Sequence, residues 1–330
     1  MNPQTLAFLT AYQNKMVGVH AANDVHALHD WLYDQYTAPF NNQFPHNNHY
    51  APANSNNNLV AAVVADLNTA LQLPESRRFQ PHIPTAAVGN LSGLVFVSAN
   101  PLVNVIPNLR ENEFRCGSMA DNREFCGNIN TFHQIAAGGG ANWWSHAIKL
   151  THLCYTEVNE LLPAPQRWPW VLAPHRLSYV GNIDLIPFHS PGDGFKLLNP
   201  NARAMQFPRQ LAKQELLKLA LSTLSMVLRL APAPRLIFVG SPLGAQLMAN
   251  HHEALGLDPR PNPANEAPPY HLLQRYEHQK TGARVMTFPR QIFTGFFNSQ
   301  PPVGFTWQGL RDRMSAFANP TFPDEGELAL

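Results

Sequence analysis

From residue 86 onward, short apolar runs alternate with helical patterns, and this alternation limits the possible folds more than any other feature of the chain. The apolar runs are LSGLVFVSAN (91–100), LSYVGNIDLIPF (177–188), PRLIFVG (234–240) and ARVMTF (283–288). Helical patterns lie between and after them, at 142–162, 209–230, around 241–252, and at 306–318. Strands that alternate with helices predict an open, mainly parallel α/β sheet with helices on both faces.

The first 85 residues predict a helical extension to this α/β domain. Pro3 begins one helix, and Asn23 caps a second helix whose apolar face holds Val25, Leu28, Trp31 and Leu32. An Asn-rich loop (41–58) separates them from a third helix at 59–73. We therefore expect a helical extension over 1–85, an α/β domain over 86–318 and an acidic tail over 319–330.

Composition narrows the class of protein. Lys and Arg (23) nearly balance Asp and Glu (22), so the net charge of +1 excludes a globally basic protein but leaves a local basic groove open. The 3 cysteines fit no disulfide scaffold, zinc site or iron–sulfur pattern. The sequence shows no secretory signal and no apolar run of membrane-spanning length. We expect a cytoplasmic monomer without a cofactor, metal cluster or membrane partner.

The residues that follow each strand are the candidates for chemistry, because ligands of open α/β sheets bind beyond the carboxyl ends of the strands. The four segments contain Asn100-Pro101, then Asn182, Asp184 and His189, then Gly240-Ser241, and finally Phe288-Pro289-Arg290. Ser241 directly follows Gly240 instead of standing between two glycines, which disfavours the nucleophile elbow of an α/β hydrolase.

Taken in order, these segments resemble the motifs of the uracil-DNA glycosylase superfamily over residues 86–318. Asn100-Pro101 resembles the first motif, and Phe125, Asn130 and Phe132 keep the spacing of the second. Asn182 resembles the strand Asn that reads the base. The resemblance implies a three-layer sandwich and hydrolysis of the N-glycosidic bond of a base flipped out of DNA.

The sequence also departs from the family pattern. Ser98 and Leu102 replace two glycines of the first motif, and Phe288 replaces the His of the last one, which reads His-Pro-Ser in the family. Because Phe288 cannot donate a proton, either Arg290 or His189 takes over the interaction with the leaving base, or catalysis on uracil is weaker and the real substrate differs.

The resemblance implies a role for each matched residue. Asn100 would position the attacking water, with Pro101 beside the base. Alternatively, Asn100-Pro101 only forms the turn that ends the strand. Phe125 would stack on the base, with Asn130 in the same pocket, although Phe125 also fits a core position. Asn182 would read the base edge or be a buried, satisfied Asn.

Other residues complete the predicted site. Asp184 lies two positions after Asn182, hence on the same strand face, and is either a water-activating carboxylate or a loop cap, which we favour. Arg290 also fits a phosphate contact. Ile292 and Phe293 fit a wedge that fills the gap left by the flipped nucleotide, or equally the packing of a helix.

The predicted function is that of a monofunctional DNA glycosylase, because no Lys in these motifs supports Schiff-base lyase chemistry. Some superfamily members in bacterial phage defence remove bulky glucosylated hydroxymethylcytosine, and Asn-rich loops suit sugar hydroxyls. Uracil or another deaminated base is the other substrate. A catalytically inert nucleic-acid or nucleotide-binding module on the same fold is the alternative. His26 and His29 have i, i+3 metal-binding spacing, but we interpret them as part of a surface helix.

Overall fold

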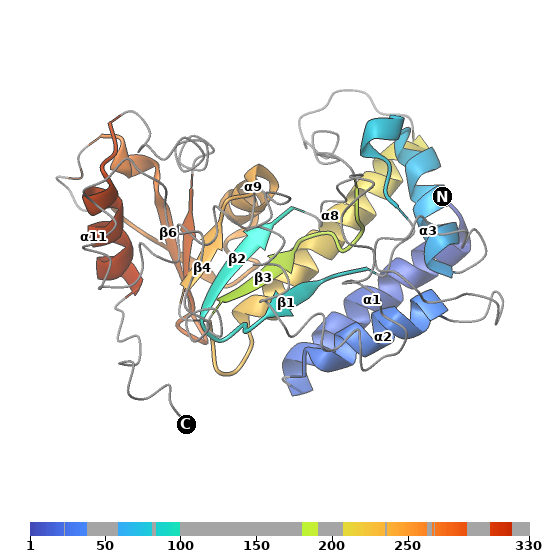
Figure 1. The fold of residues 1–330 in the computed structure, drawn as a ribbon, viewed down its shortest axis with the longest axis horizontal. Helices are drawn as coiled ribbons and strands as arrows, with labels where there is room; N and C mark the ends of the chain where they lie inside the picture. Colours follow the sequence, from blue (N-terminus) through green and yellow to red (C-terminus); the bar gives the residue numbers. More distant parts are fainter. Residues whose placement is uncertain are drawn as a thin grey trace, which may run out of the picture. The chain divides into compact units, whose positions relative to one another are not determined.

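A mixed, mostly parallel open sheet of seven strands runs through the described part of the chain (Figure 1). The computed structural model describes residues 1–22, 24–37, 59–80, 84–99, 180–190, 207–234, 236–262, 266, 268–288 and 304–318. The strands are β1 (Ala87–Gly89), β2 (Leu94–Ser98), β3 (Val180–Asp184), β4 (Leu236–Val239), β5 (Leu257–Arg260), β6 (Gln274–His278) and β7 (Arg284–Thr287). Their order in the sheet is β1-β3-β2-β4-β7-β6-β5.

The four strands predicted from apolar runs are confirmed as β2, β3, β4 and β7. β2 pairs with β4 in parallel, with Phe96 opposite Phe238, and these two rings stack with centroids 5.2 Å apart. β4 pairs with β7, also in parallel. All four residues of β4 are buried, which accounts for its uninterrupted apolar sequence: a strand covered on both faces has no polar alternation.

β2 begins at Leu94 rather than at the predicted residue 91, because a turn stands at that point. Asn90 Oδ1 accepts hydrogen bonds from the backbone N–H of Ser92 (2.8 Å) and from the Ser92 hydroxyl (2.6 Å). A side chain that mimics a backbone turn in this way favours a chain reversal. The preceding strand, β1, is only 3 residues long and gives no periodic signal.

Between β4 and β7 the sequence predicted one helix, around residues 241–252, and the structure adds β5 and β6 there. β5 pairs antiparallel with β6, and β6 pairs antiparallel with β7. β5 has the sequence LDPR and two exposed positions, as an edge strand permits, and β6 carries Arg275, Glu277 and His278. Charged strands of this kind lack the apolar runs on which the prediction depended.

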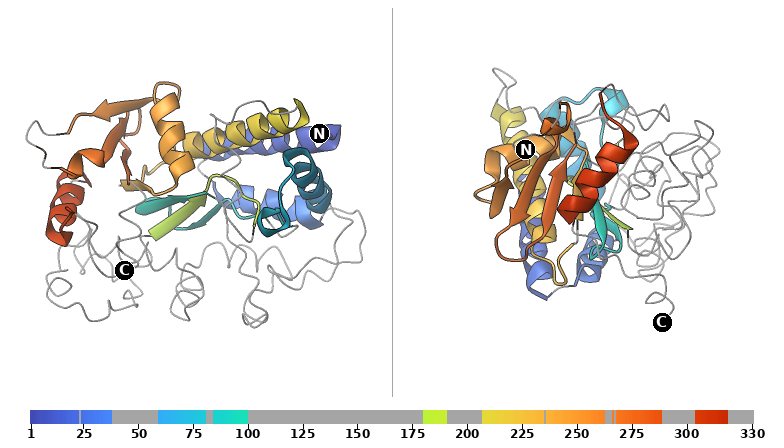
Figure 2. Two further views of the ribbon diagram at one scale, coloured as in Figure 1. Left: turned by 90° about the horizontal axis from the view of Figure 1, so that it is seen from above. Right: turned by 90° about the vertical axis from the view of Figure 1, so that its left-hand side faces the viewer.

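The N-terminal helices pack together with a helix from the middle of the chain. α1 (Pro3–Ala22) and α3 (Leu59–Leu71) both contact α8 (Phe207–Leu228), and α2 (His26–Thr37) contacts α1 and α3. Figure 2 shows α1 running alongside α8. Before α2, Asp24 accepts the Ala27 backbone N–H at 3.1 Å. Asn23 lies outside the described residues.

The spacing of Leu217, Leu221, Leu224 and Leu228 predicts a leucine stripe on one side of α8, and the buried face of this helix differs from it. Leu224 and Leu228 are buried as predicted, whereas Leu217 and Leu221 are only half-buried. The fully buried positions of this helix also include Ala212, Leu216, Leu219, Ala220 and Val227. α8 is therefore covered over a wider arc than a single i, i+3/i+4 stripe describes.

The chain divides into two compact units. One comprises Met1–Val88, Ser98–Asn128 and Ile183–Ala231, and the other Gly89–Val97, Ile129–Asn182 and Pro232–Leu330. In the second unit, α9 (Pro242–His251) follows β4 and is capped by Ser241, whose side chain accepts the Gly244 N–H at 3.4 Å. α11 (Trp307–Ala318) stands beside β6 (Figure 1). The predicted boundary at residue 85 stays a prediction.

Candidate functional site

A buried carboxylate stands at the carboxyl end of β3. Asp184 is the last residue of that strand and is 4% exposed. Ser98, the last residue of β2, donates its hydroxyl proton to Asp184 Oδ1 at 2.6 Å. We call these two residues the Ser98–Asp184 pair. A hydrogen bond from a hydroxyl to an ionised carboxylate is short and strong, and the 2.6 Å separation lies in the range of such bonds.

Backbone hydrogen bonds hold the surroundings of this pair in place. The Asp184 N–H donates to the Ala86 carbonyl at 2.9 Å. The N–H groups of the next two residues, 185 and 186, donate to the carbonyls of Ser98 and Ala99, each at 3.1 Å. The two strand ends are therefore joined on both sides of the Ser98 hydroxyl. Asn100, the predicted water-positioning residue, follows Ala99 in the sequence and lies outside the described residues.

Asn182 lies in β3 two residues before Asp184, and strand alternation puts both side chains on the same face of the sheet. Asn182 is 3% exposed. Gly181, beside it, allows close approach to a turn: a Cβ there would come within 2.5 Å of the Asn90 carbonyl oxygen and 2.8 Å of Leu91 Cδ2. Only glycine fits this position without a shift of the chain.

His189 is buried against the segment before β1. It is 2% exposed, and its Nε2 lies 3.3 Å from the Thr85 hydroxyl. Its carbonyl accepts the Gln80 N–H at 2.7 Å, and the Thr85 N–H donates to the Pro187 carbonyl at 3.0 Å. These contacts anchor residues 187 and 189 to Gln80 and Thr85. The role predicted for His189 at the leaving base stays a prediction.

The position where the glycosylase motif carries His is part of the core here. Phe288 is 4% exposed, its ring lies 5.4 Å from that of Phe238, and its N–H donates to the Val239 carbonyl at 3.0 Å. Packing therefore accounts for the Phe at this position. The remaining predicted site residues lie outside the described residues; they are Pro101, Phe125, Asn130, Arg290, Ile292 and Phe293.

Sequence reasoning missed two residues of this region. Ser98 was noted only as a replacement for a glycine, although a hydroxyl at the end of a buried strand was a usable signal. Tyr12 of α1 is fully buried, and burial followed by the negative charge of Asp184 raises its pKa well above the ordinary value. No pattern in the sequence connects a tyrosine in the first helix with a carboxylate 172 positions later (184 − 12).

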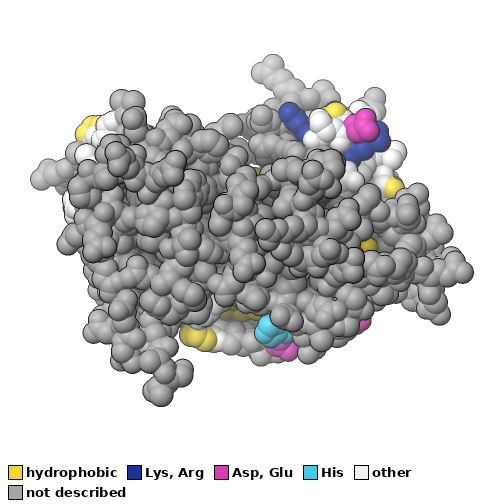
Figure 3. All heavy atoms as spheres, in the orientation of Figure 1, with side chains coloured by type: hydrophobic (Ala, Val, Ile, Leu, Met, Phe, Trp, Pro, Cys, Tyr) yellow, Lys and Arg dark blue, Asp and Glu magenta, His cyan; other side chains and the backbone are white. Residues whose placement is uncertain are grey.

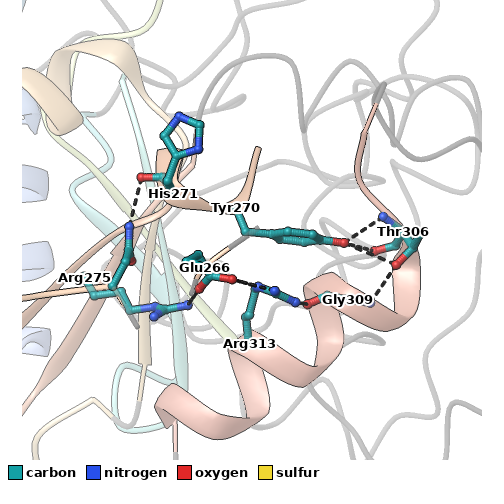
Figure 4. Close-up of polar contacts among 8 residues, drawn as sticks. Glu266, Tyr270, His271, Arg275, Thr306, Gly309 and Arg313 are labelled. Carbon is teal, nitrogen blue, oxygen red and sulfur yellow. Dashed lines mark hydrogen bonds and ion pairs between the residues drawn. The ribbon is translucent and has the colours of Figure 1, made fainter. Parts of the chain in front are cut away.

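A second cluster of charged side chains lies in the second unit, where its acidic and basic groups pair with one another (Figure 4). Glu266, 5% exposed, pairs with Arg275 at 3.3 Å and with Arg313 at 2.5 Å. Arg313 also donates to the Gly309 carbonyl at 3.0 Å, and its guanidinium lies 3.6 Å from the centroid of the Tyr270 ring. This Glu266 cluster fastens α11 to the residues before β6. Glu266 is paired with both arginines inside the cluster, so we assign the cluster a structural role.

The prediction that His26 and His29 belong to a surface helix is wrong for His29, which is 4% exposed. Burial, then the neighbouring His26, lowers the pKa of His29 to about 4. The rings lie 6.1 Å apart, and no group of three or more His, Cys, Asp or Glu side chains in the described ranges has a metal-binding arrangement.

The visible charged surface near η1 (Glu75–Arg77) is mixed in sign. Figure 3 shows acidic and basic side chains close together in the region where Figure 1 draws this turn. Glu75 and Arg78 are exposed, and Arg77 is half-buried. The turn therefore does not form the local basic patch that the sequence leaves open. None of the helices in the described residues combines the length and apolarity needed to cross a membrane.

No family model matches this chain, and comparison with curated proteins and with solved structures found no match. The α/β sheet is therefore established by the structure, and the family resemblance rests on the motifs alone.

Proposed function

We propose that this chain is a monofunctional DNA base glycosylase of the cytoplasm, in which Asp184 activates the attacking water. The observation that carries the proposal is the Ser98–Asp184 pair, in which a buried carboxylate at the end of β3 is bonded to a half-buried hydroxyl at the end of β2, two residues before Asn100 in the sequence. This is the edge of an open α/β sheet where ligands bind. The carboxylate lies on the same strand face as Asn182, the proposed base reader.

The proposed reaction is hydrolysis. The oxygen of a water molecule bonds to C1′ of the flipped nucleotide, and the C1′–N bond breaks with its electron pair going to the base. One proton of the water passes to the Asp184 carboxylate and from there to the released base or to solvent. The products are a free base and an abasic sugar.

The geometry of the pair suits this role. The Ser98 bond occupies one of about four acceptor positions of the carboxylate and fixes its orientation. A charge held in a water-poor site interacts more strongly with the positive charge that builds up on the sugar in the transition state. Asn100 would hold the same water through its side-chain carbonyl, and Phe125 would stack on the base.

Glucosylated hydroxymethylcytosine in phage DNA and uracil or another deaminated base are the proposed substrates. The first would make this a phage-defence enzyme and the second a repair enzyme. One observation favours a second candidate, the inert nucleic-acid-binding module: Phe288 occupies a core position where the glycosylase motif has its proton donor.

Two substitutions test the proposed chemistry. Asp184→Asn keeps the shape of the side chain but cannot accept a proton, so base release should fall at least about 100-fold, with DNA affinity within a few-fold. Ser98→Ala should lower release about tenfold. Asp312→Asn makes the same chemical change on an exposed carboxylate of α11 and should change neither quantity. Normal release by Asp184→Asn would rule out the assigned role.

A further inference from the structure

Tyr12 combines complete burial with an unpaired polar group. The residue is 0% exposed, and its hydroxyl has no hydrogen-bond partner among the described residues. Its ring is well packed: it stacks on Trp31 with centroids 5.7 Å apart and planes 13° from parallel, and lies 6.4 Å from Phe8. Buried hydroxyls nearly always have a partner, so this one needs a physical reason.

The packing of α1 shows where Tyr12 faces. Phe8, Tyr12 and Met16 are spaced by four residues and share one side of the helix. The Phe8 ring lies 6.3 Å from the ring of Phe188. The Thr223 hydroxyl contacts both Met16 Sδ (3.4 Å) and the carbonyl of residue 185 (3.5 Å). On α1, Tyr12 therefore stands between Phe8, which contacts Phe188, and Met16, which reaches residue 185 through Thr223. Residues 185–188 are the segment that leaves Asp184.

Electrostatics agrees with this placement. After burial, the charge of Asp184 is the next cause that raises the pKa of Tyr12. The hydroxyl therefore keeps its proton at neutral pH and is available as a neutral hydrogen-bond donor. Tyr12, Asp184, Phe188 and Thr223 all belong to the same compact unit.

We propose that Tyr12 is a positioning residue of the Ser98–Asp184 pair, its hydroxyl donating a hydrogen bond to the water molecule that Asp184 activates. The inference rests on the proposed glycosylase function. It makes the N-terminal helices part of the site, because α1 supplies the donor and α8 and residues 185–188 hold α1 in position. A water held between a phenol and a carboxylate has the two or more polar partners that a buried water needs.

The first test is Tyr12→Phe, which keeps the stacked ring and removes only the hydroxyl. We expect an unchanged or higher melting temperature, DNA affinity within about twofold, and single-turnover base release lowered by about tenfold or more. Tyr276→Phe is the matched control, because Tyr276 is also buried but its hydroxyl donates to Gln274 at 3.1 Å. It should lower the melting temperature without changing release. If Tyr12→Phe behaves like this control, its hydroxyl has a structural partner and the proposal is overturned.

The second test does not depend on catalysis. Melting temperatures of Tyr12→Phe, Asp184→Asn and the double variant form a double-mutant cycle. A shared water makes the two effects non-additive, and additive effects would overturn the proposal. If the wild-type protein releases no base from any DNA, the glycosylase function fails, while the cycle still decides whether Tyr12 and Asp184 are coupled.

Discussion

Replacing Glu266 with Gln tests the structural role of the Glu266 cluster. The carboxylate is 5% exposed and is shared by Arg275 (9% exposed) and Arg313 (24% exposed). Removing one partner of a buried ion pair leaves a charge without compensation and typically costs about 3–5 kcal/mol. Arg313 is partly solvated and keeps its contact with the Tyr270 ring, so we expect a loss near the lower limit, about 3 kcal/mol.

Urea unfolding measures this loss as a shift of the midpoint at constant m-value. The matched control is Glu277→Gln, which removes the partner of Arg260 in an exposed pair of the same unit, with a separation of 2.8 Å and side chains 48% and 31% exposed. Surface pairs contribute about 0–1 kcal/mol, so the control should lose little. Equal losses for the two variants would refute the argument that burial makes the Glu266 cluster important.

Two further predictions concern single positions. Gly181→Ala should lower the free energy of unfolding by about 1–3 kcal/mol, because the added Cβ meets the backbone of Asn90. Gly18→Ala, in the interior of α1 with nothing within 4 Å of its Cβ, should raise the free energy of unfolding by about 0.5–1 kcal/mol. A loss of stability at both positions would contradict the contact argument. The pKa of His29 in the folded protein, about 4, lies below its unfolded value, so stability present above about pH 6.5 is lost as the pH falls toward 4. Urea unfolding should show that the free energy of unfolding falls by about 2 kcal/mol between pH 7.5 and 5 in the wild-type protein but not in His29→Gln. The same fall in that variant would assign the effect to another group.

The sequence predicted the strands that are buried on both faces. Apolar runs as short as LIFV in β4 favour a buried strand over a helix once Pro and Gly mark their ends. The sequence did not reveal β5 and β6, because these strands carry Asp, Glu and Arg in place of an apolar run: Arg260 is exposed, Asp258 and Glu277 are half-buried, and buried Arg275 is paired with Glu266. The wide buried arc of α8 was also missed, since a helix that packs against both α1 and α3 is buried beyond a single apolar stripe.

The sequence pointed to part of the candidate site, and the roles of its residues stay predictions. The rule that strand ends carry chemistry located Asp184 and Asn182, because it depends only on local patterns. Our preference for a loop-capping Asp184 did not anticipate the bond from Ser98, which joins two strands 86 residues apart in the sequence. Tyr12 could not be found, since its position depends on how α1 packs. His29 was placed at the surface because a histidine on an amphipathic helix gives no sign of which neighbour will cover it.

The central claim is that this chain releases bases from DNA, and mass spectrometry of the released bases tests it most directly. The wild-type protein is incubated with DNAs that contain uracil, other deaminated bases or glucosylated hydroxymethylcytosine, and with unmodified DNA. We predict one class of free base, with a matching number of abasic sites, and release by Asp184→Asn that is at least about 100-fold lower. Binding to these DNAs without any free base would contradict the glycosylase proposal and support the inert binding module.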